Sequence, residues 1–154
     1  MAEVETPSDA GQVDTPLAEF IGYAMKRALS IVQADLSRVL GGFGLRAVSF
    51  SALSIVVAQP GLTQTQLADA LQIERSNLVT ILDELSGRGL IIRAPVAQDR
   101  RRHALMATAE GQTLAQAAQT AVKTHERALF SCLTPEEQHE LKRLLTKFRG
   151  QAGA

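Results

Sequence analysis

The spacing of apolar residues constrains this chain most, because it is helical almost throughout and changes only between residues 90 and 107. Before that stretch, three short helices are predicted at 47–58, 63–70 and 74–87, the first two separated by Pro60-Gly61. The first is apolar nearly all round, which is typical of a buried helix. The pattern predicts a mainly helical fold in which three packed helices lead directly into a small sheet.

The third of these helices has the clearest apolar stripe. Leu78, Ile81, Leu82 and Leu85 follow the spacing i, i+3, i+4, i+7, which places them on one helical face. The second helix has a clear start, because Thr63 and Gln66 fit a capping box. We therefore expect the four apolar residues in a core, with polar residues on the opposite face of the third helix.

The stretch from 90 to 107 predicts a two-stranded hairpin with a long basic loop. Leu90–Arg93 and His103–Ala107 have the character of short strands, and Ala94–Arg102 joins them. Residues 88–103 hold five arginines against one aspartate. Such a cluster suits contact with a polyanion, although a solvated charged face is the commoner explanation of a basic run.

Longer helices are predicted at both ends. Thr15-Pro16 has the residues that begin a helix, whose apolar stripe continues to Gly41-Gly42. A fifth helix is predicted from Thr108 to about Phe130, and Thr134–Glu137 carries the capping signals of a sixth. The apolar stripes of the first and sixth helices exceed what a core of ~95 residues could cover, so we expect a homodimer.

Composition excludes several classes of protein. The chain of 154 residues has the length of one domain, and its single Cys132 cannot form an internal disulfide. No apolar run approaches the ~18 residues that a membrane span needs. Residues 1–19 contain five acids and no base, which is unlike a signal peptide. We expect a soluble protein in a reducing, cytoplasmic setting.

The order of these elements is that of a winged helix-turn-helix. In that plan the amino-terminal half of the third helix enters the major groove of DNA, and the hairpin wing reaches the backbone or the minor groove. Asp83 would repel phosphate, so the contact zone should end before it. The residues of this unit that we expect to contact DNA are Thr63, Gln64, Arg75, Ser76, Asn77, Val79, Thr80 and Arg93. On composition alone a solvated polar face explains them as well, and the adjoining arginines favour DNA.

Four stretches together form a more specific pattern: Pro60–Ala68, Ser76–Leu85, Arg88–Ile91, and Asp99–Arg101 with Ala107–Gly111. Taken jointly they resemble the MarR family of winged-helix transcriptional regulators, over about residues 16–149. The resemblance implies a dimer that binds a pseudo-palindromic operator and releases it when a small molecule binds. It also implies wing roles, in which Asp99 orients the loop and Arg101 inserts beside the minor groove, as suits a buttressed guanidinium. Arg100 and Arg102, on either side of Arg101, complete the expected DNA contacts.

The expected organisation is an acidic disordered tail at 1–14, dimerisation helices at 15–42 and 108–150, and a DNA-binding domain at 43–107. The resemblance implies an effector pocket where the dimerisation helices meet this domain. Its candidate lining residues are Lys26, Arg27, Arg38, Phe43, Arg46 and Phe50. The bases could neutralise an anion, or be merely solvated. Gly44–Arg46 and Ile73–Val79 are similar to repressors of aromatic-acid catabolism, which implies an aromatic acid or its CoA thioester as effector.

Other functions have less support in the sequence. The three histidines, His103, His125 and His139, lack helical-spacing partners for a metal, and no motif indicates a cofactor or catalysis. Cys132 lies between the fifth and sixth helices, whereas peroxide-sensing MarR proteins carry theirs near the start of the first helix. The serious alternative is a winged-helix module that binds proteins without DNA, and the run Arg100–Arg102 favours DNA over it.

Overall fold

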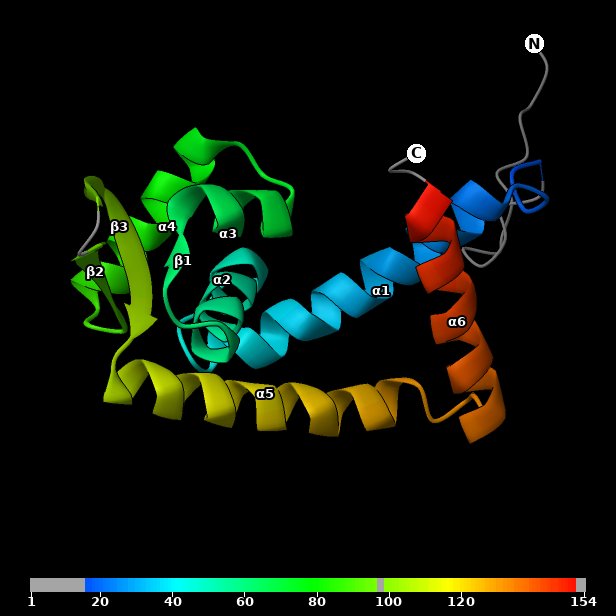
Figure 1. Cartoon of the computed structure of the whole chain (residues 1–154). Coiled ribbons are helices and arrows are strands. Elements are labelled where there is room, and N and C mark those ends of the chain that lie inside the picture. Colours follow the sequence, from blue (N-terminus) through cyan, green and yellow to red (C-terminus); the bar gives the residue numbers. More distant parts are fainter. Residues whose placement is uncertain (1–15, 97–98, 152–154) are drawn as a thin grey trace, which may run out of the picture. The chain divides into compact units, whose positions relative to one another are not determined.

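A computed structural model describes residues 16–96 and 99–151 of the chain, without the side chains of 95–103 and 151 (Figure 1). The acidic tail predicted at 1–14 lies outside this part. The elements, in order, are α1 (Ile21–Gly41), α2 (Ala47–Ala58), β1 (Leu62–Thr63), α3 (Gln64–Leu71), α4 (Arg75–Gly87), β2 (Ile91–Val96), β3 (Asp99–Ala107), α5 (Ala109–Leu129) and α6 (Pro135–Gln151). By its internal contacts the chain divides into two units, residues 1–34 and residues 35–154.

The second unit holds the predicted winged helix-turn-helix. α2 contacts α3, α4 and α5, so it lies at the centre of the helical packing (Figure 1). The core is aliphatic, and the stripe predicted on α4 is confirmed, since Leu78, Ile81, Leu82 and Leu85 are all buried. Burying each such side chain stabilises the fold by about 1.5–3 kcal/mol. This packing fixes which face of α4 remains in solvent.

The sheet has three strands rather than the predicted two. β1 pairs antiparallel with β3 through Leu62↔Leu105 and Thr63↔Ala104, and β3 lies between β1 and β2. The amide of Gly61 also donates to the carbonyl of Leu105, at 2.9 Å. β1 has two residues, which is too short for an alternating pattern to reveal. The capping box predicted at Thr63 and Gln66 is confirmed, so β1 runs directly into α3.

The first helix begins later than Thr15-Pro16 predicted. Residues 16–19 form a turn, in which the amide of Phe20 donates to the carbonyl of Leu17 at 3.1 Å. The carbonyl of Phe20 then accepts from the amides of Tyr23 and Ala24, so regular helical bonding starts with Ile21. Pro16 is thus the first residue of a hydrogen-bonded turn, and α1 begins after that turn.

The wing strands are longer than predicted, and the expected loop Ala94–Arg102 is mostly strand. Regular antiparallel pairing runs from Ile91↔Ala107 to Pro95↔His103, and the next pair is Val96↔Asp99. These last two pairs are one residue apart on β2 and four residues apart on β3. Residues 100–102 therefore interrupt the regular pairing of the two strands. A charged run does not prevent backbone pairing, because exposed strands tolerate charged side chains.

The junction between the wing and α5 is closely packed. The hydroxyl of Thr108 donates to the carbonyl of Gly89 at 2.7 Å and accepts from the amide of Gly111 at 3.0 Å. The amide of Thr108 donates to the carbonyl of Leu90 at 3.0 Å. A Cβ atom at Gly111 would lie 2.0 Å from that same Leu90 oxygen. Glycine is therefore required at position 111, because only a residue without a Cβ atom lets the start of α5 lie this close to the backbone between α4 and β2.

Gly111→Ala is expected to destabilise the protein by about 3 kcal/mol, because overpacking against a backbone carbonyl outweighs the better helix propensity of alanine. Urea unfolding of both proteins measures the difference. Gly87→Ala is the matched control, since a Cβ atom there meets nothing within 4 Å. Equal stability of Gly111→Ala and the parent would contradict the close approach.

Candidate nucleic-acid interface

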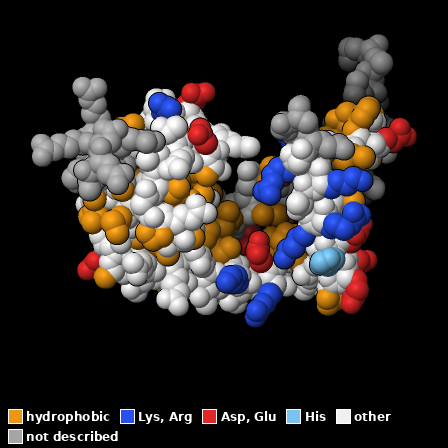
Figure 2. Space-filling model, viewed as in Figure 1, with side chains coloured by type: hydrophobic (Ala, Val, Ile, Leu, Met, Phe, Trp, Pro, Cys, Tyr) orange, Lys and Arg blue, Asp and Glu red, His pale blue; other side chains and the backbone are white. Residues whose placement is uncertain are grey.

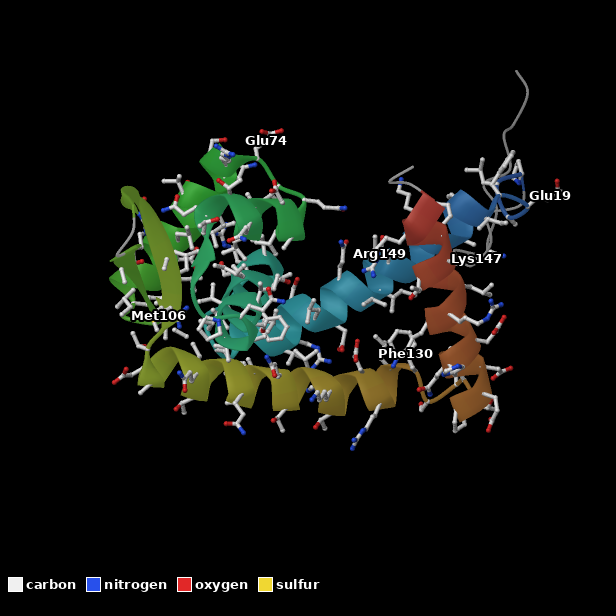
Figure 3. All side chains as sticks on the ribbon, in the orientation of Figure 1. Glu19, Glu74, Met106, Phe130, Lys147 and Arg149 are labelled. Atoms are coloured by element: carbon white, nitrogen blue, oxygen red, sulfur yellow. The ribbon has the colours of Figure 1, made fainter. Side chains whose placement is uncertain are left out.

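The amino-terminal half of α4 presents a continuous polar face to solvent. A tight turn precedes it, with Gln72 in the left-handed conformation (φ 53°) and the amide of Ile73 bonded to the carbonyl of Ala68 at 3.2 Å. Glu74, labelled in Figure 3, stands just before the first helical residue. The predicted contact residues of this helix are all exposed: Arg75, Ser76, Asn77, Val79 and Thr80. Their donors, acceptors and methyl groups suit the edges of bases in a major groove.

The two predicted contact residues at the start of α3 are half-buried. The hydroxyl of Thr63 accepts from the amide of Gln66 at 3.3 Å, and the Thr63 amide donates to the Gln66 side-chain oxygen at 2.9 Å. Gln64 follows as the first residue of the helix. The hydroxyl of Thr63 therefore serves the helix start, which leaves Gln64 as the freer side chain of the two.

An ion pair joins the wing to α4. Nη2 of Arg93, on β2, donates to Oδ1 of Asp83 at 2.5 Å. The Arg93 side chain is 29% exposed and that of Asp83 63% exposed. An open cavity of about 520 Å³ adjoins the pair, lined also by Ser86, Ile91 and Ile92. Asp83 was expected to limit the contact zone, and pairing with Arg93 offsets its repulsion toward phosphate.

The wing residues Asp99, Arg100, Arg101 and Arg102 lie in β3, and their side chains are outside the described part. Their backbone includes the irregular step of the ladder. Met106, labelled in Figure 3, lies farther along the same strand and is 41% exposed. The structure thus places the arginine run on the hairpin that follows α4, as the sequence predicted, and describes only its backbone.

The candidate effector residues are divided between the two units of the chain. Lys26 and Arg27 belong to the first unit, and the others to the second. Arg38 is hydrogen-bonded to Asp35 and lies 3.5 Å from Nδ1 of His125. Arg46 donates to Oε2 of Glu84 at 2.6 Å. Phe43 and Phe50 are half-buried and pack against the core. The two arginines of the second unit therefore already have carboxylate partners.

From the sequence Glu84 is not singled out as a functional candidate, and Arg88 counts only as one base of the stretch 88–103, whereas its guanidinium binds backbone carbonyls. Both lie on or just after the carboxyl-terminal half of α4, and both reach the segment between α1 and α2. The pattern Glu84-x-x-x-Arg88 resembles an ordinary pair one helical turn apart, which would have hidden their long-range partners.

A groove of about 440 Å³ lies between α5 and α6. Its lining residues are Lys123, Glu126, Arg127, Phe130, Gln138, Leu141, Lys142 and Leu145. Phe130 lies where α5 leads into α6 (Figure 3). Lys and Arg side chains gather over α6 in Figure 2, and the helix also exposes Leu141, Leu144, Leu145 and Phe148. So much exposed apolar surface on one helix is typical of an interface with another protein.

Within the described residues, no three His, Cys, Asp or Glu side chains come together as a metal site. Cys132 is a free, exposed thiol in the connection between α5 and α6. None of the described helices combines the length and the apolar character that crossing a bilayer requires.

Comparison with known proteins gives consistent matches. The model described as MarR family matches residues 43–102. A putative transcriptional regulatory protein for the hcr operon of Thauera aromatica is 34% identical, over 88% of this chain and 82% of its own length. The solved structure of a transcriptional repressor, CouR, bound to a 23-mer DNA duplex is 36% identical, with a TM-score of 0.85, and covers 90% of this chain and 98% of its own.

A structure of CouR from Rhodococcus jostii, bound to p-coumaroyl-CoA, is 26% identical. Its TM-score is 0.75, and the match covers 84% of this chain and 91% of that one. The Thauera relative and the two CouR structures match well beyond the helices and wing of the candidate interface, to which the family model is confined.

Thr80→Val is expected to change the preferred DNA sequence, because it removes one hydroxyl from the exposed face of α4 and keeps the side-chain volume. Each lost base contact costs about 1–3 kcal/mol, and the dependence of binding on salt should stay as in the parent. Selection from random duplexes measures the preference. Thr124→Val, at an exposed position on α5, is the matched control. An unchanged preference for Thr80→Val would exclude this hydroxyl as a base contact.

Proposed function

Because the chain belongs to the MarR family of DNA-binding transcriptional regulators, which are not enzymes, we propose that it is a repressor released from its operator by an aromatic effector. The operator is pseudo-palindromic, and the effector is a small aromatic acid or its CoA thioester. The observation that carries the proposal is the exposed polar face of α4. The opposite face of this helix is buried, and the helix leads directly into the basic hairpin.

DNA contact is assigned to α4, to the start of α3 and to the wing. The exposed residues of α4 read base edges, and Asp99 and Arg101 of the wing act beside the minor groove. Arg93 stays close to the recognition helix through Asp83, so it contacts phosphate only at the edge of the interface. The second function considered from the sequence, a module that binds proteins without DNA, has no specific observation in its favour.

The protein acts as a homodimer. Residues 15–42 and 108–150 supply the dimer contacts, and residues 43–107 form the DNA-binding domain. The support is apolar surface on both helices, such as Ile21, 79% exposed on α1, and Phe148, 61% exposed on α6. Two symmetry-related recognition helices then enter successive major grooves on one side of the duplex. We propose a cytoplasmic location, which is consistent with binding to an operator.

The effector is an anion with an aromatic ring. The p-coumaroyl-CoA complex of a relative supports this class of ligand. Of the residues proposed to bind it, Phe43 and Phe50 can pack against a ring, and Lys26, Arg27, Arg38 and Arg46 can neutralise a carboxylate or phosphate. Because Arg38 and Arg46 are paired with Asp35 and Glu84, an acidic ligand that uses them must displace a carboxylate of the protein.

Phe148→Glu is expected to shift the protein from dimer toward monomer, because a charge on the exposed apolar stripe of α6 must be buried when the interface forms. Sedimentation at micromolar concentration should give about twice the 16.5 kDa chain mass for the parent. Lys147→Glu is the control, with a charge change at the adjacent exposed position. A folded, monomeric parent would rule out the dimer.

An effector should raise the melting temperature and weaken operator binding together. A thermal-shift series with aromatic acids and p-coumaroyl-CoA identifies ligands, because binding to the folded state alone stabilises it. A ligand found in this way should weaken operator affinity ~100-fold, for which ~3 kcal/mol of preference for the DNA-free state suffices. If such a ligand leaves operator affinity unchanged, the protein is not a ligand-released repressor.

A further inference from the structure

Two guanidinium groups tie α4 to the connection between α1 and α2. Arg88, directly after α4, donates from Nη1 to the carbonyl of Gly44 at 2.6 Å and from Nη2 to the carbonyl of Phe43 at 3.0 Å. In the opposite direction, Nη2 of Arg46 donates to Oε2 of Glu84 at 2.6 Å. We call Arg46, Glu84 and Arg88 the junction clamp.

Two neighbouring residues, Ser49 and Gly44, also contact the junction clamp. The other carboxylate oxygen of Glu84 accepts from the hydroxyl of Ser49 at 3.4 Å, and Ser49 is wholly buried. Gly44 has φ +61°, and a Cβ atom there would lie 3.5 Å from Nη2 of Arg88. Two successive carbonyls are thus presented to one planar guanidinium, an arrangement that the single ammonium of lysine does not match.

These bonds act over long distances in the sequence. The two arginines bind partners 38 to 45 residues away, so the bonds set how separate elements lie against each other and contribute little to forming a single helix. The Arg46 side chain is 64% exposed and that of Glu84 is 30% exposed. Ion pairs with so much solvent access contribute little to the free energy of unfolding. Their main effect is on geometry.

Glu84 is well placed to control that geometry. On α4 it lies one turn after Thr80 and two turns after Asn77, so the three residues share a side of the helix. Arg46 lines a shallow cavity together with Asn77 and Thr80, which places the clamp beside the proposed recognition face. A rotation or slide of α4 relative to the connection would break these bonds and move the base-reading residues.

We propose that Arg46, Glu84 and Arg88 are positioning residues, which hold α4 in the pose that reads DNA and link that pose to the end of α1. This role rests on the proposed function, since it concerns how the same interface is aligned. The clamp acts on sequence discrimination, because base contacts need alignment, whereas attraction to phosphates tolerates displacement.

The test uses the full chain and duplexes that the parent enriches from a random library. Affinity is measured for an enriched duplex and for a shuffled duplex of equal length, at one salt concentration. In Arg46→Met and in Arg88→Met, the ratio of the two affinities should fall about tenfold, which corresponds to ~1.4 kcal/mol. Taking the ratio removes the general effect of a lost positive charge, which weakens binding to both duplexes.

Three further proteins sharpen the test. The double variant Arg46→Glu with Glu84→Arg should have a higher ratio of enriched to shuffled affinity than Arg46→Met, because it restores the ion pair with the charges reversed. The affinity ratio of Arg88→Lys should lie between that of the parent and that of Arg88→Met. Glu140→Gln is the control, since Arg143 donates to Glu140 at 2.6 and 2.7 Å in a similar exposed pair on α6, lowering the pKa of that carboxyl. It should leave the ratio unchanged.

Clamp variants that keep the parent ratio would overturn the proposal. So would variants that lose the ratio only together with their folded structure, judged by thermal melting, because the residues would then be structural. A parent that enriches no duplex would contradict the repressor assignment itself, and with it this proposal.

Discussion

One face of α4 is buried in the aliphatic core, and this packing sets the orientation of the helix. Leu78 and Leu82 are almost completely excluded from solvent, while Val79 between them is 43% exposed. Because one face of the helix is packed in the core, the opposite face lies in solvent regardless of which polar residues it carries. The candidate DNA contacts are therefore a consequence of core packing, and their chemistry is free to specify a sequence.

The parts beyond α4 are attached to it by a few short connections. Gly111 lets α5 approach the carbonyl of Leu90. This close contact fixes the start of α5 against the residues that join α4 to β2. Arg93 joins the wing to α4 through Asp83, and Arg88 joins the connection after α1 to the same helix. These contacts tie α4, the wing and the connection after α1 to one another.

Local signals in the sequence were sufficient for most helices and for the identity of the fold. The caps at Thr63 and Thr134 and the stripe of α4 each depend on residues within two turns, and the structure has them as predicted. The resemblance to one family was carried by the joint pattern and is confirmed by the matches. The exposed positions of α4 followed from the same periodicity.

The remaining features depend on contacts between distant residues. β1 is a strand only because β3 lies beside it, and the wing strands extend beyond their apolar residues because backbone pairing continues. The partners of Arg46 and Arg88 lie 38 to 45 residues away, so no local pattern could reveal them. Arg46 was predicted from its charge to face an effector, and its bond to Glu84 suggests how an acidic ligand could compete for it.

In the proposed dimer, two copies of α4 read DNA on one side of a duplex. Selection of duplexes by the parent protein, followed by footprinting on the enriched sequence, tests this arrangement. We expect an imperfect inverted repeat whose half-site centres lie about one helical turn, ~10 bp, apart, protected in both halves. A single unrepeated site, or protection without any shared sequence, would contradict it.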